Sequence, residues 1–483
     1  MSEEPTGDVV RGDRFSGGPA RGFLSSLAAD ERIFDADLAV DRAHVVMLAE
    51  QGVLGDDEAG EVLAALDEIE AAGHDALPDG EDVHEAIEAA VISRVGPEGG
   101  KMHTARSRND EVATCIRYRL REDLLSAVEA TLALRDALAT TAEAHTETVM
   151  PGYTHLQPAQ PTTLAHYLSS YEQAVARDTA RLLDAYDRAN RSPLGAAAFA
   201  GTTFDVDRER TAGLLGFDGV LTNSMDAVST RDFLVESLAA LGALATTLSG
   251  LAEDLIIFAN RDEVDLSDDY SSTSSIMPQK KNPDTLELVR ATAGDAVGGL
   301  TGLLTTLKGL PRAYNRDLQR ATPHAWEAVD AVTEATDVAG GAVATATWDE
   351  GALRGAAGEG FSTATGVADL LAASGVPFRT AHEVVATAAE AGADVDALDA
   401  AAEEVLGESL FAYVDREALA AALDPAESVA SRDSAGGPAP AAVADALDAA
   451  WDRYEADEAA LDARREALDA AESELRTEVS AYV

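Results

Sequence analysis

The chain has 483 residues, of which 46% are hydrophobic and 5% aromatic, and its 87 acidic residues against 36 basic ones give a formal net charge of −51. This length and apolar content allow a large core, exclude global disorder and predict two or three domains. So anionic a surface repels nucleic acid and anionic membranes, and we expect neither as a partner. One explanation of the charge is an ordinary acidic protein. The size of the imbalance favours adaptation to a salt-saturated cytoplasm, because at molar salt the Debye length is about 3 Å and self-repulsion largely disappears.

The single cysteine, Cys115, permits no intrachain disulfide, which fits a reducing cytoplasm. The N-terminus is acidic and polar and shows no signal-peptide pattern. The most apolar segment, residues 237–252, is closed by Glu236 and Glu253 and contains several Ser and Thr, so it is too short and too polar to span a bilayer. We therefore expect a cytoplasmic protein in which this segment belongs to a buried bundle helix.

Hydrophobic periodicity predicts an all-α fold. Residues 14–100 show short helical segments separated by turns, and one helix is expected to begin at Asp82 and stop near Gly96. Between about residues 110 and 350 the helical spacing extends over long stretches, which predicts five long helices that bundle, across subunits as well as within one. The face that follows Pro161 consists of Leu164, Leu168, Tyr171, Val175, Leu182 and Tyr186.

Beyond about residue 355 the segments shorten again. In the last stretch apolar residues recur every seven positions while the other faces are acidic, which predicts a surface helix docked by one stripe. The stripe is Tyr454, Leu461, Leu468, Leu475 and Tyr482. We divide the chain into an N-terminal helical domain (1–109), a central long-helix bundle (110–355) that carries a loop at 265–283, and a C-terminal small helical domain with a terminal acidic helix (356–483).

Basic residues gather in one stretch of this acidic chain. Between Lys101 and Arg121 there are six bases and two acids, a local excess that would let an anionic substrate approach. The alternative is a set of ion pairs with the acidic surface. A more specific feature of the same stretch is the string at 103–110, His-Thr-Ala-Arg-Ser-Arg-Asn-Asp.

Two further stretches hold candidate site residues. Residues 152–161, Gly-Tyr-Thr-His-Leu-Gln-Pro-Ala-Gln-Pro, place Thr154 and His155 in a run bracketed by prolines just before a long helix. A single histidine near a loop is more often structural than catalytic, so that alternative stays open. The other stretch is 308–319, Lys-Gly-Leu-Pro-Arg-Ala-Tyr-Asn-Arg-Asp-Leu-Gln.

The predicted site is organised around residues 271–284, Ser-Ser-Thr-Ser-Ser-Ile-Met-Pro-Gln-Lys-Lys-Asn-Pro-Asp. Small hydroxyl residues lead through Lys280 to Asn282 and Pro283, where Asn can cap a helix and Pro can occupy its first position. Helix N-termini attract anions, so this is a candidate carboxylate or phosphate site, with a solvated connection as the alternative. Glu287 follows among apolar neighbours, where an unpaired carboxylate would be costly unless it faces solvent.

Together these stretches resemble a known family over nearly the whole chain. Residues 271–284 are similar to the signature loop of the fumarase/aspartase superfamily, and its core at 277–284, with residues 103–110 and 308–319, resembles the argininosuccinate lyase branch. The resemblance implies a three-domain fumarase/aspartase-like fold whose central bundles form the helical core of a homotetramer, with active sites shared between subunits. It implies no cofactor and no metal, and the sequence contains no Walker loop or dinucleotide fingerprint.

The activity implied by the resemblance is a β-elimination that splits the C–N bond of argininosuccinate into arginine and fumarate, the last step of arginine biosynthesis. Proton loss next to a carboxylate builds a dianionic aci-carboxylate, which needs concentrated positive charge. The resemblance makes Ser274 the base, assigns Lys280 and the following helix N-terminus to the aci-carboxylate, and has His155, paired with Glu287, move protons. The substrate contacts that it implies are Ser107, Arg108, Asn109, Thr154, Asn282, Tyr314 and Gln319, with weaker matches at Ser26, Asp30 and Arg231.

The chain departs from the family pattern at several positions. Thr273 stands where the superfamily loop usually has Gly, which would restrict loop closure, and Ala105 and Glu111 replace a usual Gly and Gln. The lysine expected near residue 322 is absent. One carboxylate contact is therefore missing, and Arg320 is a candidate substitute with a different geometry.

Two alternatives to argininosuccinate cleavage remain at this point. One is adenylosuccinate lyase or another lyase of the superfamily, which would share the general chemistry. The other is a non-catalytic helical-bundle protein of the lens-crystallin type, which shares the fold. The intact set of hydroxyl, imidazole, ammonium and carboxylate groups favours an enzyme.

Overall fold

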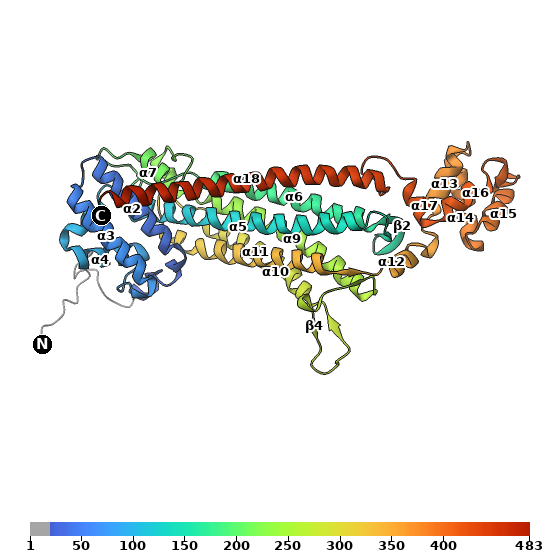
Figure 1. The fold of residues 1–483 in the computed structure, drawn as a ribbon, viewed down its shortest axis with the longest axis horizontal. Coiled ribbons are helices and arrows are strands. Elements are labelled where there is room, and N and C mark those ends of the chain that lie inside the picture. The colour runs from blue at the N-terminus through green and yellow to red at the C-terminus, as the bar shows by residue number, and fades with distance from the viewer. Residues whose placement is uncertain (1–19) are drawn as a thin grey trace.

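Five long helices run side by side through the middle of an elongated molecule (Figure 1). The computed structural model describes residues 20–483, so residues 1–19 of the predicted N-terminal domain lie outside the described residues. The expected all-α fold and the long helices of the central region are confirmed. These helices are α5 (Arg108–Ala144), α6 (Leu164–Ala189), α9 (Asp232–Asn260), α10 (Asp284–Leu307) and α11 (Thr322–Thr345).

One large apolar core holds this bundle together. In α6 the hydroxyl of Thr163 caps the helix by accepting the N–H of His166 at 3.1 Å, and the predicted apolar face is largely buried. Helix α9 is long and apolar enough to cross a membrane by length and composition, but it packs against α6, α10 and α11. Its buried leucines belong to the bundle core, which confirms that segment 237–252 lies in a bundle helix.

Short helices with a core of their own form the N-terminal end of the molecule. Helix α4 begins as predicted, with the carboxylate of Asp82 accepting the N–H of Glu85 at 2.8 Å, and ends at Gly96. Helix α7 (Arg208–Leu214) packs against α2, and α8 (Ser224–Ser229) packs against α5. The other elements of this end are α1 (Arg21–Leu24), α2 (Phe34–Glu50), α3 (Asp56–Ala72) and α4 (Val83–Val95), with 3₁₀ segments η1 (Ala29–Ile33), η2 (His74–Ala76) and η3 (Pro97–His103).

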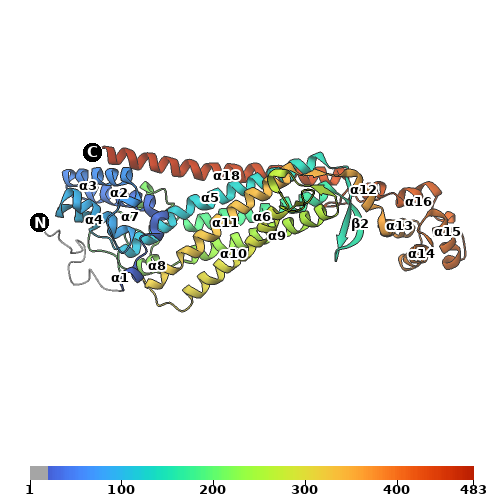
Figure 2. The same cartoon turned by 90° about the horizontal axis from the view of Figure 1, so that it is seen from below.

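A small helical lobe with a third core forms the opposite end. From it, α18 (Pro440–Ser480) runs back along α5 and α6, so that the C-terminus lies beside the N-terminal helices (Figures 1 and 2). Leu461 and Leu475 are buried, which confirms the predicted docking stripe, whereas the domain limits at 109 and 355 stay a prediction. The lobe contains α12 (Glu350–Ala357), α13 (Ala364–Ala373), α14 (Phe378–Ala391), α15 (Val395–Leu406), α16 (Arg416–Leu423) and α17 (Pro425–Ala430), with η6 (Glu359–Phe361) and η7 (Leu410–Ala412).

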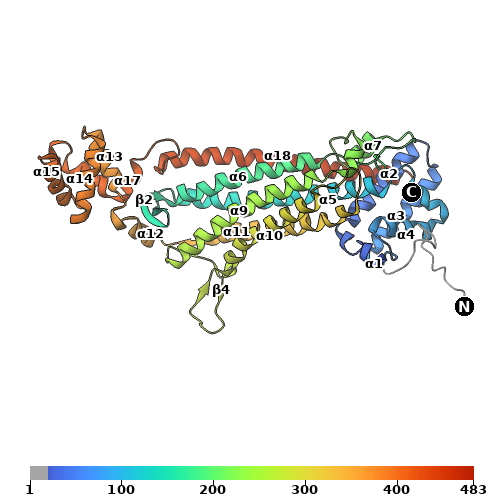
Figure 3. The ribbon, with the colours of Figure 1, turned by 180° about the vertical axis from the view of Figure 1, so that it is seen from behind.

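Two short hairpins interrupt the helical pattern within residues 20–483. The β1–β2 hairpin lies at the end of the bundle next to the C-terminal lobe, and the β4–β5 hairpin projects from the side of the bundle (Figures 1 and 3). All pairs are antiparallel: β1 (Val149–Thr154) with β2 (Gln157–Thr163), β3 (Val264–Asp265) with β6 (Thr347–Trp348), and β4 (Ser272–Thr273) with β5 (Lys281–Asn282).

The start of α10 corrects one sequence prediction. Asn282 was expected to cap the helix with Pro283 at its first position, but Pro283 is the N-cap residue and the helix begins at Asp284. Asn282 is instead paired with Ser272 in the hairpin, and its amide oxygen accepts a hydrogen bond from Lys280. The helix N-terminus still follows the loop directly, as the predicted anion site requires.

Ala105, in the turn between η3 and α5, has a left-handed backbone with φ of 63°. This conformation costs a residue with a Cβ about 1–2 kcal/mol, more than the roughly 0.5–1 kcal/mol of extra entropy that glycine loses on folding. We expect Ala105→Gly to raise the free energy of unfolding by about 0.5–1 kcal/mol, measured by urea denaturation in molar potassium chloride.

The matched control for this prediction is Ala346→Gly, because Ala346 ends α11 with φ of −64°. That variant should be less stable than the unmodified protein, because the backbone at Ala346 holds no strain for glycine to relieve. The substitution also removes a methyl group that packs on the core. A loss of stability in Ala105→Gly as well would contradict the strain at Ala105.

Candidate active site

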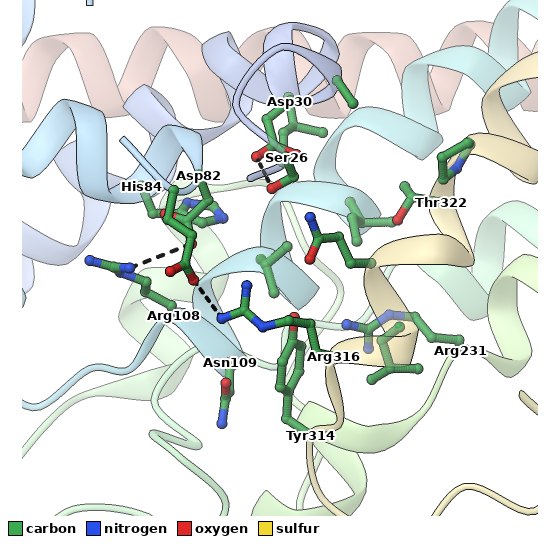
Figure 4. A pocket seen from close by; sticks show the side chains of 18 of the residues that line it. Ser26, Asp30, Asp82, His84, Arg108, Asn109, Arg231, Tyr314, Arg316 and Thr322 are labelled. Carbon is green, nitrogen blue, oxygen red and sulfur yellow. Dashed lines mark hydrogen bonds and ion pairs between the residues drawn. The ribbon is translucent and has the colours of Figure 1, made fainter. Parts of the chain in front are cut away.

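A cavity of about 360 Å³ lies where the N-terminal helices meet one end of the bundle (Figure 4). Segments far apart in the sequence contribute its walls. The predicted site residues that line it are Ser26, Asp30, Arg108, Asn109, Arg231, Tyr314 and Gln319. The predicted site residues outside it are Ser107, Thr154, His155, Ser274, Lys280, Asn282 and Glu287.

Ser26 and Asp30 form an acidic corner of this cavity (Figure 4). The hydroxyl of Ser26 donates to Asp30 Oδ2 at 2.7 Å, and the backbone N–H of Val83 donates to the same oxygen at 3.3 Å. Burial raises the pKa of Asp30, while the nearby charge of His84 acts in the opposite direction. A carboxylate held in this way can accept from an ammonium or guanidinium group of a ligand.

Arg108 and Asn109 enter the cavity from the first turn of α5. The guanidinium of Arg108 lies 3.5 Å from the carboxylate of Asp82, and the amide of Asn109 donates to the carbonyl of Ala198 at 3.1 Å. Ser107 does not line the cavity, because its hydroxyl caps α5 by accepting the N–H of Asn109 at 3.3 Å. The helix N-terminus and the guanidinium together favour an anionic group of the ligand.

Arg231 and Tyr314 form a basic corner opposite (Figure 4). Arg231 is fully buried, and burial lowers its pKa to about 10, so that it stays protonated at neutral pH. Its guanidinium donates to the carbonyl of Thr230 at 2.7 Å, while its Nε has no partner among the described residues. Burial also raises the pKa of Tyr314. A buried cation with an unpaired donor favours a ligand oxygen beside it.

Arg316 also lines the cavity, and the sequence analysis missed it. Its guanidinium pairs with Glu81 at 2.5 Å and donates to the carbonyl of Leu24 at 3.3 Å, next to the amide of Gln319, which donates to the same carbonyl at 3.1 Å. The signal available in the sequence was its place two residues after Tyr314. Charge alone could not separate it from the other arginines of the segment.

Arg320, the candidate substitute for the missing lysine, is exposed and does not line the cavity. Thr322 lines the wall near the expected lysine position instead, with Trp326 and Glu327 beside it. Arg320 therefore does not replace the lysine within this chain, and Arg316 is the cation of the segment that faces the cavity.

A buried ionic network lies behind the cavity wall. His84 lines the cavity, and its Nδ1 lies 2.8 Å from the carboxylate of Asp37. Against the effect of burial, Asp37 and Glu111 raise the pKa of His84 to about 10. Arg106 lies 2.6 Å from Asp41 and 3.0 Å from Glu111. His84 thus places a permanent positive charge at the cavity wall at neutral pH.

Two groups in this network have ligand atoms close enough together to hold a metal ion. Protein partners already occupy them, because the guanidinium of Arg106 neutralises the acidic group and the thiol of Cys115 donates to Asp37 at 3.3 Å. We interpret them as a structural network. The groups are Asp37, His84 and Cys115, and Asp37, Asp41 and Glu111.

The arginine-rich stretch divides into structural and cavity residues. Arg108 lines the cavity, whereas Arg117 and Arg121 are fully buried and donate to the backbone carbonyls of Arg188 at 3.0 Å and Leu215 at 2.8 Å. The alternative, ion pairs with the acidic surface, describes Lys101 and Arg119, which pair with nearby carboxylates. Charge along the sequence did not reveal which of its arginines are buried.

Ser274 and Lys280 lie in the β4–β5 hairpin, away from the cavity (Figures 1 and 3). The hydroxyl oxygen of Ser274 accepts the N–H groups of Ile276 at 3.3 Å and Met277 at 3.1 Å. The ammonium of Lys280 donates to the side-chain oxygen of Asn282. Backbone N–H groups aimed at a hydroxyl oxygen stabilise its deprotonated form, so these two N–H groups favour the ionised form of Ser274.

His155 lies at the tip of the β1–β2 hairpin, which the sequence analysis had treated as a loop. Thr154 pairs with Gln157, so that His155 and Leu156 form a two-residue turn with φ of 58° and 57°. Such turns normally take Asn-Gly, because each residue with a Cβ costs about 1–2 kcal/mol in this conformation. Strained backbone conformations are found mainly at functional sites, so this turn makes His155 a candidate functional residue.

Glu287 lies in the first turn of α10 and is exposed in the chain by itself. Its neighbours Leu286 and Val289 face the core, whereas Leu288 is also exposed. The expectation of an apolar setting for this carboxylate is therefore wrong for the single chain, because flanking residues in a helix point in different directions. A partner for Glu287 would have to come from another chain.

Helix length keeps these groups apart within one chain. The 37 residues of α5 separate Arg108 from the strand that leads to His155 by about 55 Å. The 24 residues of α10 separate the β4–β5 hairpin from the segment of Tyr314 by roughly 36 Å. One chain brings together the cavity residues, but it brings neither hairpin to them.

The arrangement matches known proteins closely. A lyase family model matches residues 23–298, and a model for the argininosuccinate lyase C-terminal region matches residues 361–430. The argininosuccinate lyase of Natronomonas pharaonis is 73% identical over 475 residues, which cover 98% of this chain and 97% of the relative. The chain belongs to the argininosuccinate lyase family. The enzyme of that name from Methanothrix thermoacetophila is 48% identical over 91% of this chain and 92% of its own length.

Solved structures place this argininosuccinate lyase family member in the expected superfamily. EDDS lyase in complex with formate is 34% identical, with a TM-score of 0.87 and 96% of each chain covered. A class II fumarase from Schistosoma mansoni has a TM-score of 0.72 at 14% identity, covering 85% of this chain and 95% of the fumarase, which shows a shared fold.

The buried network generates a prediction at Glu111. Burial raises the pKa of Glu111 well above its usual value, so the folded state keeps a proton that the unfolded state releases above about pH 4.5. Stability therefore falls as pH rises through this window. We expect Glu111→Gln to flatten that fall above about pH 4.5, because glutamine has no carboxyl to titrate, and to leave the variant more stable than the unmodified protein at the upper end of the pH range.

Urea denaturation in molar potassium chloride at several pH values measures this effect. The control is Glu466→Gln, at an exposed position of α18, which should leave the pH dependence as in the unmodified protein. A steeper fall of stability with pH in Glu111→Gln would contradict the raised pKa of Glu111.

Proposed function

We propose that the protein cleaves argininosuccinate into arginine and fumarate, as the last step of arginine biosynthesis. The observation that carries this proposal is the cavity that joins an acidic corner at Asp30 to a basic corner at Arg231 in a chain 73% identical to an argininosuccinate lyase. An α-amino acid end carries one ammonium and one carboxylate, which match these two corners. The cavity then holds the arginine half of the substrate.

The elimination itself needs a base and a cation at the succinate half. Ser274 supports the first role, because the N–H groups of Ile276 and Met277 stabilise its alkoxide. Lys280 and the N-terminus of α10 support the second, since both would face the negative charge that grows on the substrate carboxylate when the proton leaves. Asn282, bonded to Lys280, holds the ammonium in place.

His155 is proposed to move a proton toward the leaving guanidinium or into Ser274, with Glu287 holding its charge. The left-handed turn at His155 and Leu156 supports a functional reason for this histidine, because a less strained residue would stabilise the hairpin. Thr154, at the end of the same strand, would contact the substrate. Each positioned acid or base contributes about 10² to 10⁴ in rate.

Several chains are proposed to build each site, as a homotetramer in a salt-rich cytoplasm. The separation of the two hairpins from the cavity supports assembly, and so do apolar side chains that one chain leaves exposed. A charge of −51 is also tolerated best where salt screens it. The exposed side chains include Leu156, Ile276, Leu288, Val297 and Leu304.

The first test is turnover in molar potassium chloride. We expect the protein to release fumarate from argininosuccinate, followed by absorbance at about 240 nm, and expect Ser274→Ala to lose at least about 10²-fold in kcat, the contribution of a positioned base. The variant should keep its helical circular dichroism and its oligomer size, because Ser274 lies on an exposed hairpin. Near-normal fumarate release by Ser274→Ala would refute the base assignment.

Side-by-side assays separate the rival activities. Faster release of fumarate from adenylosuccinate, or elimination from EDDS in preference to argininosuccinate, would assign the protein to another lyase of the superfamily. Binding of argininosuccinate in calorimetry without cleavage would favour the non-catalytic bundle protein.

A mixing experiment tests the shared sites. Ser274→Ala and Arg108→Gln chains are each expected to be inactive, since each lacks one part of every site. After the two are dissociated in low salt and reassembled together, sites that take these residues from different chains should regain roughly a quarter of the activity. Reassembly of each variant alone is the control. Absence of any recovery in mixed oligomers of full size would place both residues in the same chain's site.

A further inference from the structure

Helix α11 contains two consecutive glycines, Gly340 and Gly341, just before its last turn, which ends at Thr345. Glycine is unfavourable in a helix interior relative to alanine, so a pair of them points to a packing requirement. A Cβ at Gly340 would make an ordinary contact with the backbone of Leu134 on α5, 3.4 Å away. The requirement at Gly341 is much stronger.

The ring of Tyr270 fills the space where a Gly341 side chain would lie. A Cβ built on Gly341 would overlap the phenol oxygen of Tyr270 and approach its Cε1 to 2.8 Å. Tyr270 is partly buried against the bundle core, and its 3₁₀ segment, η4 (Asp268–Tyr270), packs on α11. Gly341 thus forms a notch in α11 that receives this one aromatic ring, while Gly340 faces Leu134 on α5.

Tyr270 ends η4 two residues before β4 begins at Ser272. The β4–β5 hairpin projects from the side of the bundle (Figure 3). The hairpin is tied together internally by the pairing of Thr273 with Lys281 and by the N–H of Ser274, which donates to the carbonyl of Lys280 at 3.1 Å. Because these contacts join its two strands, the hairpin moves as one rigid unit. Its position relative to the bundle is set by its two stems.

The other links at the first stem are weak in high salt. Lys281 pairs with Asp265 at 3.1 Å and with Asp268 at 2.9 Å, but all three side chains are exposed. Exposed ion pairs contribute little and are screened over about 3 Å at molar salt. Ser271 adds one hydrogen bond to the carbonyl of Ser267 within the stem itself, which does not reach the bundle. Ser272 donates to the carboxylate of Asp284 at the start of α10, but this hydrogen bond is exposed to solvent. Steric packing of Tyr270 is independent of salt.

We infer that Tyr270, seated in the notch at Gly341, is a positioning residue that fixes the hairpin of Ser274 and Lys280 relative to the bundle. It touches neither substrate nor reacting atoms and acts through the hairpin. The inference rests on the proposed function for its effect on turnover. The position of the hairpin itself can be followed without any substrate.

Gly341→Ala is the principal test, because one methyl group excludes the Tyr270 ring from the notch. We expect kcat for argininosuccinate to fall by roughly 10²-fold, the effect of a displacement of about 1 Å at a reacting group, with a smaller change in KM because the cavity is untouched. Trypsin in molar potassium chloride should cut after Lys280 and Lys281 at least about fivefold faster, since a released hairpin opens more often. The control, Gly355→Ala on α12, adds a methyl group into open space and should change neither quantity.

Tyr270→Ala is the second variant. Together with Gly341→Ala and the double variant it completes a double-mutant cycle. It should loosen the hairpin as Gly341→Ala does, and Gly341→Ala should then have no further effect in the Tyr270→Ala chain, because the notch is already empty. Thermal denaturation well above the assay temperature would show that the folded fraction is not the cause. If Gly341→Ala fails to fold, Tyr270→Ala alone still decides the inference through the trypsin rate.

The possible results distinguish a failure of this inference from a failure of the proposed function. Unchanged trypsin cutting in the folded variants, or effects of the two substitutions that add fully, would overturn the role of the notch. Faster cutting with normal kcat would also overturn it, since the hairpin would then not need to be held. If the unmodified protein does not cleave argininosuccinate, the proposed function fails, while the trypsin rates still show whether Tyr270 holds the hairpin.

Discussion

The length of the bundle helices is the constraint on which the rest of the molecule depends. An α-helix is stiff over its length, and the 37 residues of α5 hold its two ends about 55 Å apart. The first turn of α5 enters the cavity through Arg108, and the chain that leaves its last turn leads to His155. No rearrangement of loops can join these groups within one chain. The proposed active site needs both, which is the reason for proposing that the cavity end of one chain lies next to a hairpin of another.

The strongly acidic composition makes the placement of the cations informative. Surface charges are screened at high salt, but buried charges are screened much less. Arg106, Arg231 and His84 are all buried, and each is fixed by carboxylates or carbonyls of the same chain. The cavity therefore keeps its positive corner and its charged wall at salt concentrations that would suppress surface attraction. The specificity of such a site depends on internal geometry rather than on the overall field of the protein.

Features with a repeating pattern along the chain, such as the long helices, could be predicted from the sequence. Features that depend on how the helices pack against one another could not. Apolar spacing predicted the long helices, and Asp82 and Gly96 marked the ends of α4. The turn at His155 and Leu156 could not be predicted, because neither residue favours a left-handed backbone. The burial of the arginines and the exposure of Glu287 depend on which face of each helix packs against a neighbouring helix. The order of charges along the sequence does not reveal that face. Asp82, His84 and Arg316 were missed in the cavity for the same reason.

Three departures from the family pattern have three different physical consequences. Glu111 takes the place of a neutral glutamine, and burial raises the pKa of its carboxyl well above the usual value, which favours the neutral form. Ala105 occupies a left-handed turn that suits glycine and lowers stability there. Thr273 lies in β4, paired with Lys281, where a β-branched residue is favoured and the freedom of glycine is not used. Thr273 stiffens the strand that directly precedes Ser274. The hairpin then moves as one rigid unit, so its alignment with the bundle depends on contacts at its base such as the one between Tyr270 and α11.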